Sequence, residues 1–412
     1  MPPQAKQPVM RTPSLVRNVA ILASCQAFFF MANTILITTS GLVGLTIAPT
    51  PAMATIPLAA QFLGTMLATM PASLLMGRIG RRAGLVTGGL FGIASGLLST
   101  YAILQASFAL FIAGGLLYGV FAAFSQYYRF SAADAADVSA AEDKLATRAR
   151  AISLVMAGGL VAAFLGPELA KATQNLIPPF VFAGCYLAIA VVALFATVTL
   201  LFLDIPMRAA EVTDEPARPL LEIIRQPVAI TAFTSALVAY VTMNLLMTMT
   251  PLAMLACGFA FADSATVIQW HVVGMFAPSF FTGSLIARFG AERLIATGGA
   301  LMVACIAINV AGIELGNFLA SLFLLGLGWN FMFIGGTTLL TRAHRPSEKA
   351  KVQGFNDFCL FTAVTVSAAA SGALHEWVSW QPMNLVALPL VLAVITLALL
   401  RHRQSGPVGT AA

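Results

Sequence analysis

Long apolar segments are the feature of this sequence that most limits its fold. Twelve of them follow one another, and each is close to the roughly 20 residues that a helix needs to cross the hydrocarbon core of a bilayer. Charged residues make up only 9% of the chain, whereas a soluble domain carries about 25%. Because so few charges cannot cover a water-exposed surface, we expect lipid to surround most of the chain.

Prolines, glycines and short charged clusters separate the apolar segments and set their predicted ends. The sequence therefore predicts an all-α membrane protein with twelve transmembrane helices. The expected helices cover residues 18–42, 54–77, 83–104, 107–130, 151–172, 179–203, 228–252, 265–287, 294–313, 318–341, 352–374 and 383–400. The two longest polar stretches between them are 131–150 and 204–227.

The positions of Lys and Arg predict the orientation of these helices. If the N-terminus lies in the cytoplasm, every one of the 22 basic residues except Lys171 falls in a cytoplasmic segment. Basic residues are enriched on that side of membrane proteins, and a wrong helix count would scatter them over both sides. We therefore expect a multi-pass protein of the bacterial inner membrane with both termini in the cytoplasm.

The charge and cysteine patterns exclude several other classes of site. The net charge of +6 comes from short basic clusters between apolar segments, not from a basic stripe interleaved with aromatic residues, so we predict no nucleic-acid partner. The five cysteines show no CxxC pair and no metal-ligand spacing. We predict no metal site and no cofactor. The partners that we expect are the lipid bilayer, a small-molecule substrate and a proton, for a monomeric protein.

An internal repeat divides the chain into halves. Shifting the sequence by 210 or 211 residues matches positions in three consecutive helices and the loop between two of them. The pairs are Asn33 with Asn244, Gly64 with Gly274, Arg78 with Arg288, Gly80 with Gly290, and 87–89 with 297–299. Parallel repeats of this kind are a known transporter architecture. We predict two six-helix bundles, 1–203 and 228–412, joined by a cytoplasmic linker at 204–227.

The loop after the second helix resembles a motif of the major facilitator superfamily, G-x-x-x-D-R-x-G-R-R. The matching residues are Arg78, Gly80, Arg81 and Arg82, with Arg288 and Gly290 in the second half. Gly77 stands where the family has its acidic residue. This resemblance covers nearly the whole chain and implies alternating access between two six-helix bundles. It also implies a gating role for these loop residues, although positive-inside topology alone would explain the arginines.

Two further resemblances concern the direction of transport and the substrate. Gly166-Pro167 resembles the core of the family's antiporter motif, which would favour export. Residues 127–130 and 353–357 resemble a bacterial subgroup of the superfamily that includes riboflavin importers. The sequence therefore leaves import and export open, and a planar aromatic metabolite such as riboflavin is the expected substrate.

Transporters of this architecture bind substrate near the membrane midplane, between the halves. Helix depth, the repeat and the family's cavity-lining helices predict a set of amide, aromatic and imidazole side chains there. The set is Phe29, Asn33, Gln61, Tyr118, Tyr240, Asn244, Gln269, His271, Trp329 and Asn330. Amides supply donors and acceptors, and aromatic rings supply flat faces, which suits a planar solute with little or no charge. Helix–helix packing is the alternative role for any one of these side chains.

Ionisable residues in membrane helices are candidates for proton coupling. The sequence predicts three: Asp357, Glu168 and His271. Glu168 could instead be a solvated carboxylate at the membrane interface. Asp357 could instead be a helix N-terminal charge or a partner of arginines in the inner loops. At the inner end of the fourth helix, we expect Arg129 and Asp134 to pair.

These features favour a secondary active transporter, coupled to protons, that moves a small organic solute. Efflux of drugs or metabolites by antiport is the alternative within transport, and a receptor or assembly factor on a transporter fold is the alternative outside it. We do not predict an enzyme, because the four histidines have no HExxH-type spacing. The sequence also has no GxxxxGK[ST] loop for an ATP-driven pump.

Overall fold

The computed structural model describes residues 14–137, 139, 144–206 and 218–404, and the regular elements of these residues are all helices. The first half contains α1 Leu15–Ile47, the 3₁₀ turn η1 Pro51–Met53, α2 Ile56–Ile79, α3 Arg81–Leu104, α4 Phe108–Ser125, α5 Tyr128–Asp137, α6 Lys144–Thr173 and α7 Ala183–Leu200.

The second half begins with a short helix on the linker side. It contains α8 Leu220–Ile224, α9 Pro227–Ala256, α10 Phe261–Phe276, α11 Ser279–Phe289, α12 Ala291–Ala311, α13 Leu315–Leu340, η2 Pro346–Glu348, α14 Lys349–Trp377, α15 Trp380–Val386 and α16 Leu388–Gln404.

The number of membrane-spanning helices agrees with the sequence. Among the described residues, eleven helical stretches are long and apolar enough to cross a bilayer, and α10 with α11 form a twelfth if this bent pair is one span. The prediction of an all-α protein with twelve spans is confirmed, with ends that shift by a few residues. The domain boundaries, with 204–227 as the linker, remain a prediction, and residues 207–217 lie outside the described residues.

Two of the predicted segments differ in detail. The segment 265–287 is not one straight helix, because α10 and α11 meet at an angle of 43° beside Pro278, where proline has no N–H for the helix ladder. The stretch 131–150 is not simply a polar loop. Its first part continues as α5, and α6 begins at Lys144, so helix extends beyond the apolar segments at both of its ends.

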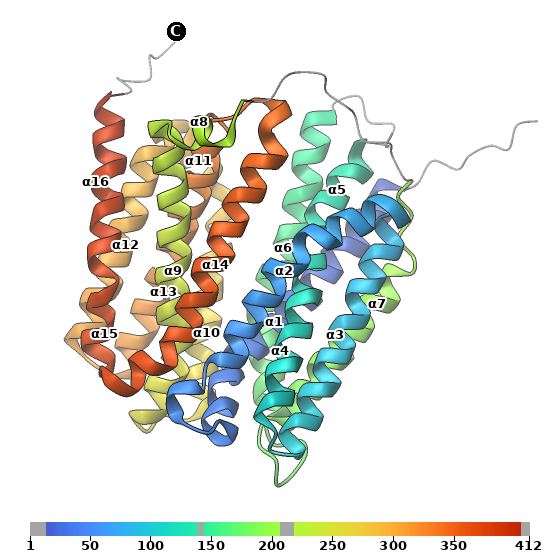
Figure 1. Ribbon diagram of the computed structural model, residues 1–412, viewed down its shortest axis with the longest axis vertical. Helices are drawn as coiled ribbons and strands as arrows, with labels where there is room; N and C mark the ends of the chain where they lie inside the picture. Colours follow the sequence, from blue (N-terminus) through green and yellow to red (C-terminus); the bar gives the residue numbers. More distant parts are fainter. Residues whose placement is uncertain (1–13, 138, 140–143, 207–217, 405–412) are drawn as a thin grey trace, which may run out of the picture.

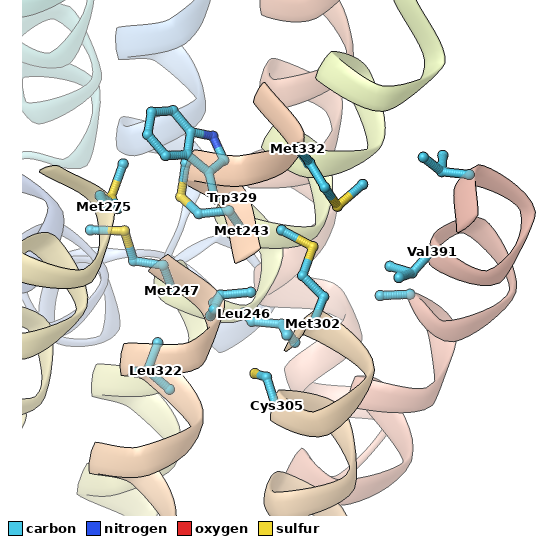
Figure 2. Close-up of a cluster of buried hydrophobic side chains, with 14 of the residues drawn as sticks. Met243, Leu246, Met247, Met275, Met302, Cys305, Leu322, Trp329, Met332 and Val391 are labelled. Carbon is cyan, nitrogen blue, oxygen red and sulfur yellow. The ribbon is translucent and has the colours of Figure 1, made fainter. Parts of the chain in front are cut away.

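The two halves lie side by side, each with its own buried apolar core (Figure 1). The core of the second half is rich in methionine. Figure 2 shows Met243, Met247 and Met275 on α9 and α10 around Trp329 of α13. Methionine side chains are flexible and polarisable and can adapt to ligands of irregular shape, so this core has a deformable wall where it reaches the centre of the molecule.

We call one end of the molecule the basic end; it is at the top of Figure 1 and carries α8, the last turn of α16 and the loops at Gly80, Gly290 and His344. In the figure the helices of the two halves approach each other at the opposite end and diverge toward the basic end. α14 contacts both η1 and α2 across the halves, and α10 contacts α6.

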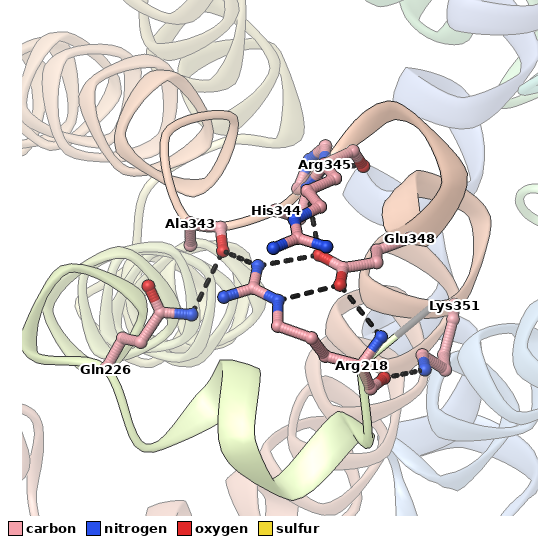
Figure 3. Close-up of polar contacts among 7 residues, drawn as sticks. All are labelled: Arg218, Gln226, Ala343, His344, Arg345, Glu348 and Lys351. Atoms are coloured by element: carbon pink, nitrogen blue, oxygen red, sulfur yellow. Dashed lines mark hydrogen bonds and ion pairs between the residues drawn. The ribbon is translucent and has the colours of Figure 1, made fainter. Parts of the chain in front are cut away.

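A buried carboxylate anchors the linker side at the basic end. The side chain of Glu348 is fully buried and accepts hydrogen bonds from Arg218 Nε at 2.8 Å and Arg218 Nη2 at 2.7 Å (Figure 3). The backbone N–H groups of Arg218 and Arg345 also donate to it. This guanidinium holds the pKa of the Glu348 carboxyl well below its usual value. The cluster fixes the start of α8 against the loop between α13 and α14.

Candidate functional site

A large cavity lies between the two halves. It is lined from the first half by α1, α2, α4–α6 and from the second by α9, α10, α13 and α14, and it holds about 1480 Å³ of empty space, including solvent at its mouth. A second hollow shares Arg129, Phe276, Trp329 and Asp357 with it and continues to His344 at the basic end. Sites for small molecules are concave and mostly apolar with a few polar groups, and the lining of this cavity has that composition.

The cavity is closed at the end opposite to the basic end. The N–H of Gly372 on α14 donates a 3.0 Å hydrogen bond to Thr55 Oγ1 beside α2, and the rings of Phe182 and Phe261 pack with centroids 4.9 Å apart. Since each contact joins one half to the other, the structure is closed on that side and accessible from the basic end.

Aromatic rings form the broad walls of the cavity. In the second half, Trp329 and Phe333 stack with centroids 5.1 Å apart and planes 13° apart, and Tyr240 meets both rings edge-on. Phe30 of α1, from the first half, packs directly against Phe276 of α10, with ring centroids 4.7 Å apart. Flat aromatic faces from both halves are suited to a planar ligand.

Amide side chains lie deeper in the cavity. Gln61 Nε2 donates to Asn33 Oδ1 at 3.1 Å, which leaves Gln61 Oε1 buried and without a partner among the described residues. Asn244, the repeat partner of Asn33, lines the opposite wall and makes a long 3.5 Å hydrogen bond to Val364 O. The Nε1 atom of Trp329 is likewise buried without a partner. Buried polar atoms normally have one, so Gln61 Oε1 and Trp329 Nε1 are exceptions in the side chains that line this cavity.

A positive and a negative side chain face the cavity nearer the basic end. Arg129 of α5 and Asp357 of α14 line it and are close enough to interact electrostatically. The predicted pair of Arg129 with Asp134 is wrong, because Asp134 binds Arg81 Nε at 2.8 Å instead. Arg129 lies in the first turn of α5, beside the cavity. Arg129 thereby brings a basic side chain to a cavity for which the sequence predicted amide, aromatic and imidazole side chains.

Six of the ten predicted pocket residues line the main cavity: Phe29, Asn33, Gln61, Tyr240, Asn244 and Trp329. The other four are placed differently. Tyr118 is buried behind Phe29 and donates a 3.4 Å hydrogen bond to its carbonyl. Gln269 lies on α10 outside the lining residues. Asn330 borders the second hollow, but its amide binds Met275 O and Ser279 Oγ, at 2.6 and 2.7 Å, and thereby holds the break between α10 and α11.

The three predicted proton-coupling residues lie in different surroundings. Asp357 lines the cavity. His271 is buried between α10 and α13, with Nδ1 2.7 Å from the carbonyl of Leu322, and does not line it. Glu168 has 58% of its side chain exposed and pairs with Lys171. Only Asp357 of the three can meet a solute in this cavity.

The predicted gating residues divide between the basic end and helix α6. Arg78, Arg82 and Arg288 are exposed at the basic end, and Gly80 has a φ of 87°, a conformation that glycine adopts without strain. Gly166 on α6 approaches α1 so closely that a Cβ would lie 3.0 Å from Thr34. Its neighbour Pro167 lies within the same helix.

Sequence reasoning missed several cavity residues, above all Arg129. Phe276, Phe333, Met243 and Met247 also line the cavity but were not predicted. For Arg129 the signal was present, since an arginine flanked by Tyr128 and Phe130 at the end of an apolar segment differs from the arginines of the loops. The apolar residues offered no such signal, because they match the rest of every segment.

Two bundles of membrane-spanning helices around a central cavity, accessible from one side, define a membrane transporter of the alternating-access type. The chain belongs to the Major Facilitator Superfamily, whose family model matches residues 22–308 and 260–411. It is thus a multi-pass secondary transporter of small molecules.

Characterised and uncharacterised relatives cover most of the chain. It is 40% identical over 396 residues to the riboflavin transporter RfnT of Brucella anthropi. The match covers 95% of this chain and 97% of that protein. It is 28% identical to the uncharacterised transporter YddS of Bacillus subtilis, over 85% of this chain and 83% of that one.

Solved structures support the fold. The human organic anion transporter MFSD10 matches with a TM-score of 0.63 at 14% identity, over 94% of this chain and 100% of that one. FucP in its outward conformation matches with a TM-score of 0.60 at 15% identity, over 93% and 98%.

Proposed function

We propose that this protein carries riboflavin into the cell across the bacterial inner membrane, coupled to protons. The observation that carries the proposal is the cavity, in which stacked aromatic rings and unsatisfied amides line one space between the halves. Riboflavin combines a flat ring system with a polyhydroxyl chain, and this lining suits both parts. The 40% identity to a riboflavin transporter over nearly the whole chain supports the same substrate.

The charge of the cavity also favours a neutral solute. Arg129 and Asp357 contribute one positive and one negative charge to the same space, so a ligand with net charge would meet one group of its own sign. Neutral riboflavin meets no such repulsion.

In this proposal the basic end faces the cytoplasm, as the distribution of basic residues predicts. The structure would then be the inward-facing state, closed to the outside by the contacts around Gly372 and open to the cytoplasm. The protein works as a monomer embedded in lipid, with the two halves rocking about the cavity.

Asp357 is the proposed proton carrier. A proton-coupled carrier needs a group that is hydrated in one state and desolvated in the other, because desolvation favours the neutral carboxyl. Asp357 lies at the part of the cavity that is continuous with the mouth, so closure at the basic end would remove its access to water. Glu168 is too exposed for such a change.

The test is ligand binding by the purified protein. Riboflavin at 100 times its dissociation constant should raise the free energy of unfolding by about 2.7 kcal/mol, seen as a higher melting temperature. A panel of sugars, amino acids and drugs at matched concentrations provides the comparison. Stabilisation by an unrelated drug but not by riboflavin would favour efflux.

A further inference from the structure

Two groups of polar side chains line the cavity, and they differ in how far they extend toward the basic end. The amides Asn33, Gln61 and Asn244 line only the main cavity, whereas Arg129 and Asp357 line both the main cavity and the hollow toward the basic end. Phe276, Trp329 and Phe333 also border both spaces. A ligand that fills the cavity therefore meets charges at one place and amides at another.

The guanidinium of Arg129 has at least one N–H donor without a hydrogen-bond partner among the described residues. This donor is the buried Nε, and the guanidinium lies 4.9 Å from the centre of the Phe130 ring. A guanidinium has five N–H donors and no acceptor. The group that completes Arg129 must accordingly be an acceptor, such as a carbonyl oxygen.

The carboxylate of Asp357 accepts hydrogen bonds, whereas the guanidinium of Arg129 donates them. Asp357 Oδ1 accepts one hydrogen bond, of 3.2 Å, from the neighbouring Asn356 Nδ2. A carboxylate offers about four acceptor positions, so most of the capacity of this cavity-lining residue is unused among the described residues. A ligand N–H is the group that fits it.

We infer that Arg129 and Asp357 together bind the imide edge of the substrate ring, with a ring carbonyl on Arg129 and the adjacent ring N–H on Asp357. This inference rests on the proposed function and deepens it. An imide places acceptor, donor and acceptor side by side in one plane, in the order that a cation next to a carboxylate requires. Since the two residues belong to different halves, the ligand edge bridges the halves at the mouth of the cavity.

The rest of the ligand then follows the lining. The ring system lies among Phe276, Trp329 and Phe333, and the hydroxyl groups of its side chain reach Asn33, Gln61 and Asn244. Hydroxyls donate and accept hydrogen bonds, as amides do. The imide role is compatible with proton uptake, because a carboxyl group keeps an acceptor oxygen in both protonation states.

The test compares riboflavin with its N3-methyl derivative, which has lost only the imide N–H. Binding to the purified wild-type protein is measured by quenching of flavin fluorescence. A hydrogen bond to a charged group implies about 10- to 100-fold weaker binding of the methylated ligand. The same comparison is made with Asp357→Asn, which keeps an acceptor oxygen, and Asp357→Leu, which has none.

We expect wild type and Asp357→Asn to discriminate between the ligands, and Asp357→Leu to bind both with the same reduced affinity. Arg129→Gln should weaken both ligands and leave their ratio unchanged, and Arg403→Gln, an exposed site on α16, should change neither. Equal binding of the two ligands by wild type overturns the imide assignment and leaves riboflavin as the substrate. This comparison uses the wild-type protein alone, so its outcome does not depend on whether any variant folds. Absence of riboflavin binding overturns the proposed function and the assignment together.

Discussion

The N–H of Gly372 donates a 3.0 Å hydrogen bond to Thr55 Oγ1, and this bond joins the two halves of the transporter at the closed end of its cavity. The approach is too close for any larger residue. A Cβ at Gly372 would lie 2.4 Å from the carbonyl oxygen of Ala52, so a side chain here must separate the halves.

Gly372→Ala should therefore destabilise the closed end and shift the protein toward the state that is open on that side. A single cysteine at Ile37, which lines the cavity on α1, reports the shift in a cysteine-free background. Its labelling by an impermeant thiol reagent from outside should become faster. Gly354→Ala on the same helix is the matched control, because a Cβ at Gly354 has no neighbour within 4 Å. Equal labelling rates in the two variants would contradict this account of closure.

Trp329→Ala should weaken riboflavin binding about tenfold or more, by analogy with the loss of one aromatic ring under a nucleic-acid base. Trp329→Phe keeps an aromatic ring at this position, stacked on Phe333, and should therefore retain most of the affinity. Trp377→Ala provides the control, since 80% of Trp377 is exposed. Titration of flavin fluorescence measures all three variants. Unchanged affinity in Trp329→Ala would exclude the aromatic wall as the ring site.

Asp357→Asn should abolish accumulation of riboflavin against its gradient while sparing exchange of labelled for unlabelled riboflavin. The amide keeps the hydrogen-bond acceptor and cannot carry a proton. Both reactions are measured in proteoliposomes with and without an imposed pH gradient. If the Asp357→Asn protein still concentrates riboflavin under a pH gradient, then the proton is carried by another group, and Glu168→Gln and His271→Gln become the next variants to examine.

Glu348→Gln should loosen α8, because it removes the charge that Arg218 binds. Hydrogen exchange at the backbone amides of α8 should become faster, while Glu314→Gln, at an exposed position next to α13, should leave it unchanged. The pKa of Glu348 is lowered from its usual 4.5 in the folded protein. Its stabilising effect is thus fully present above about pH 4.5 and is lost as the pH falls through the lower folded value. Protection of α8 that is identical in wild type and Glu348→Gln at neutral pH would contradict this role.

The sequence predicted the spans well because membrane helices have a strong physical signal. A helix in lipid must be apolar for about 20 residues, and basic residues mark one side. The predicted helix 265–287 did not include the break at Pro278, because the residues on both sides of this proline are equally apolar. What stabilises it is the amide of Asn330, which is 48 residues from its partner Thr282, and no local pattern contains that contact.

The site was predicted in part for a related reason. Depth along a helix follows from counting residues, and Asn33, Gln61 and Asn244 line the cavity at the predicted depth, while their part in binding remains a prediction. The direction of a side chain around the helix depends on packing, and Tyr118 therefore turned out to lie behind Phe29. Arg129 was predicted only as a charge at the inner end of the helix 107–130, because the apolar segment ends there, and a residue count does not show that α5 turns it toward the cavity.

Uptake of riboflavin by the purified protein in proteoliposomes tests the central claim most directly. With an acidic exterior and a neutral lumen, we predict that riboflavin accumulates inside above its external concentration, and that dissipating the pH gradient returns it to equilibrium. Uptake no greater than in protein-free liposomes, under the same gradient and with protein of verified folding, would contradict the claim that this transporter imports riboflavin.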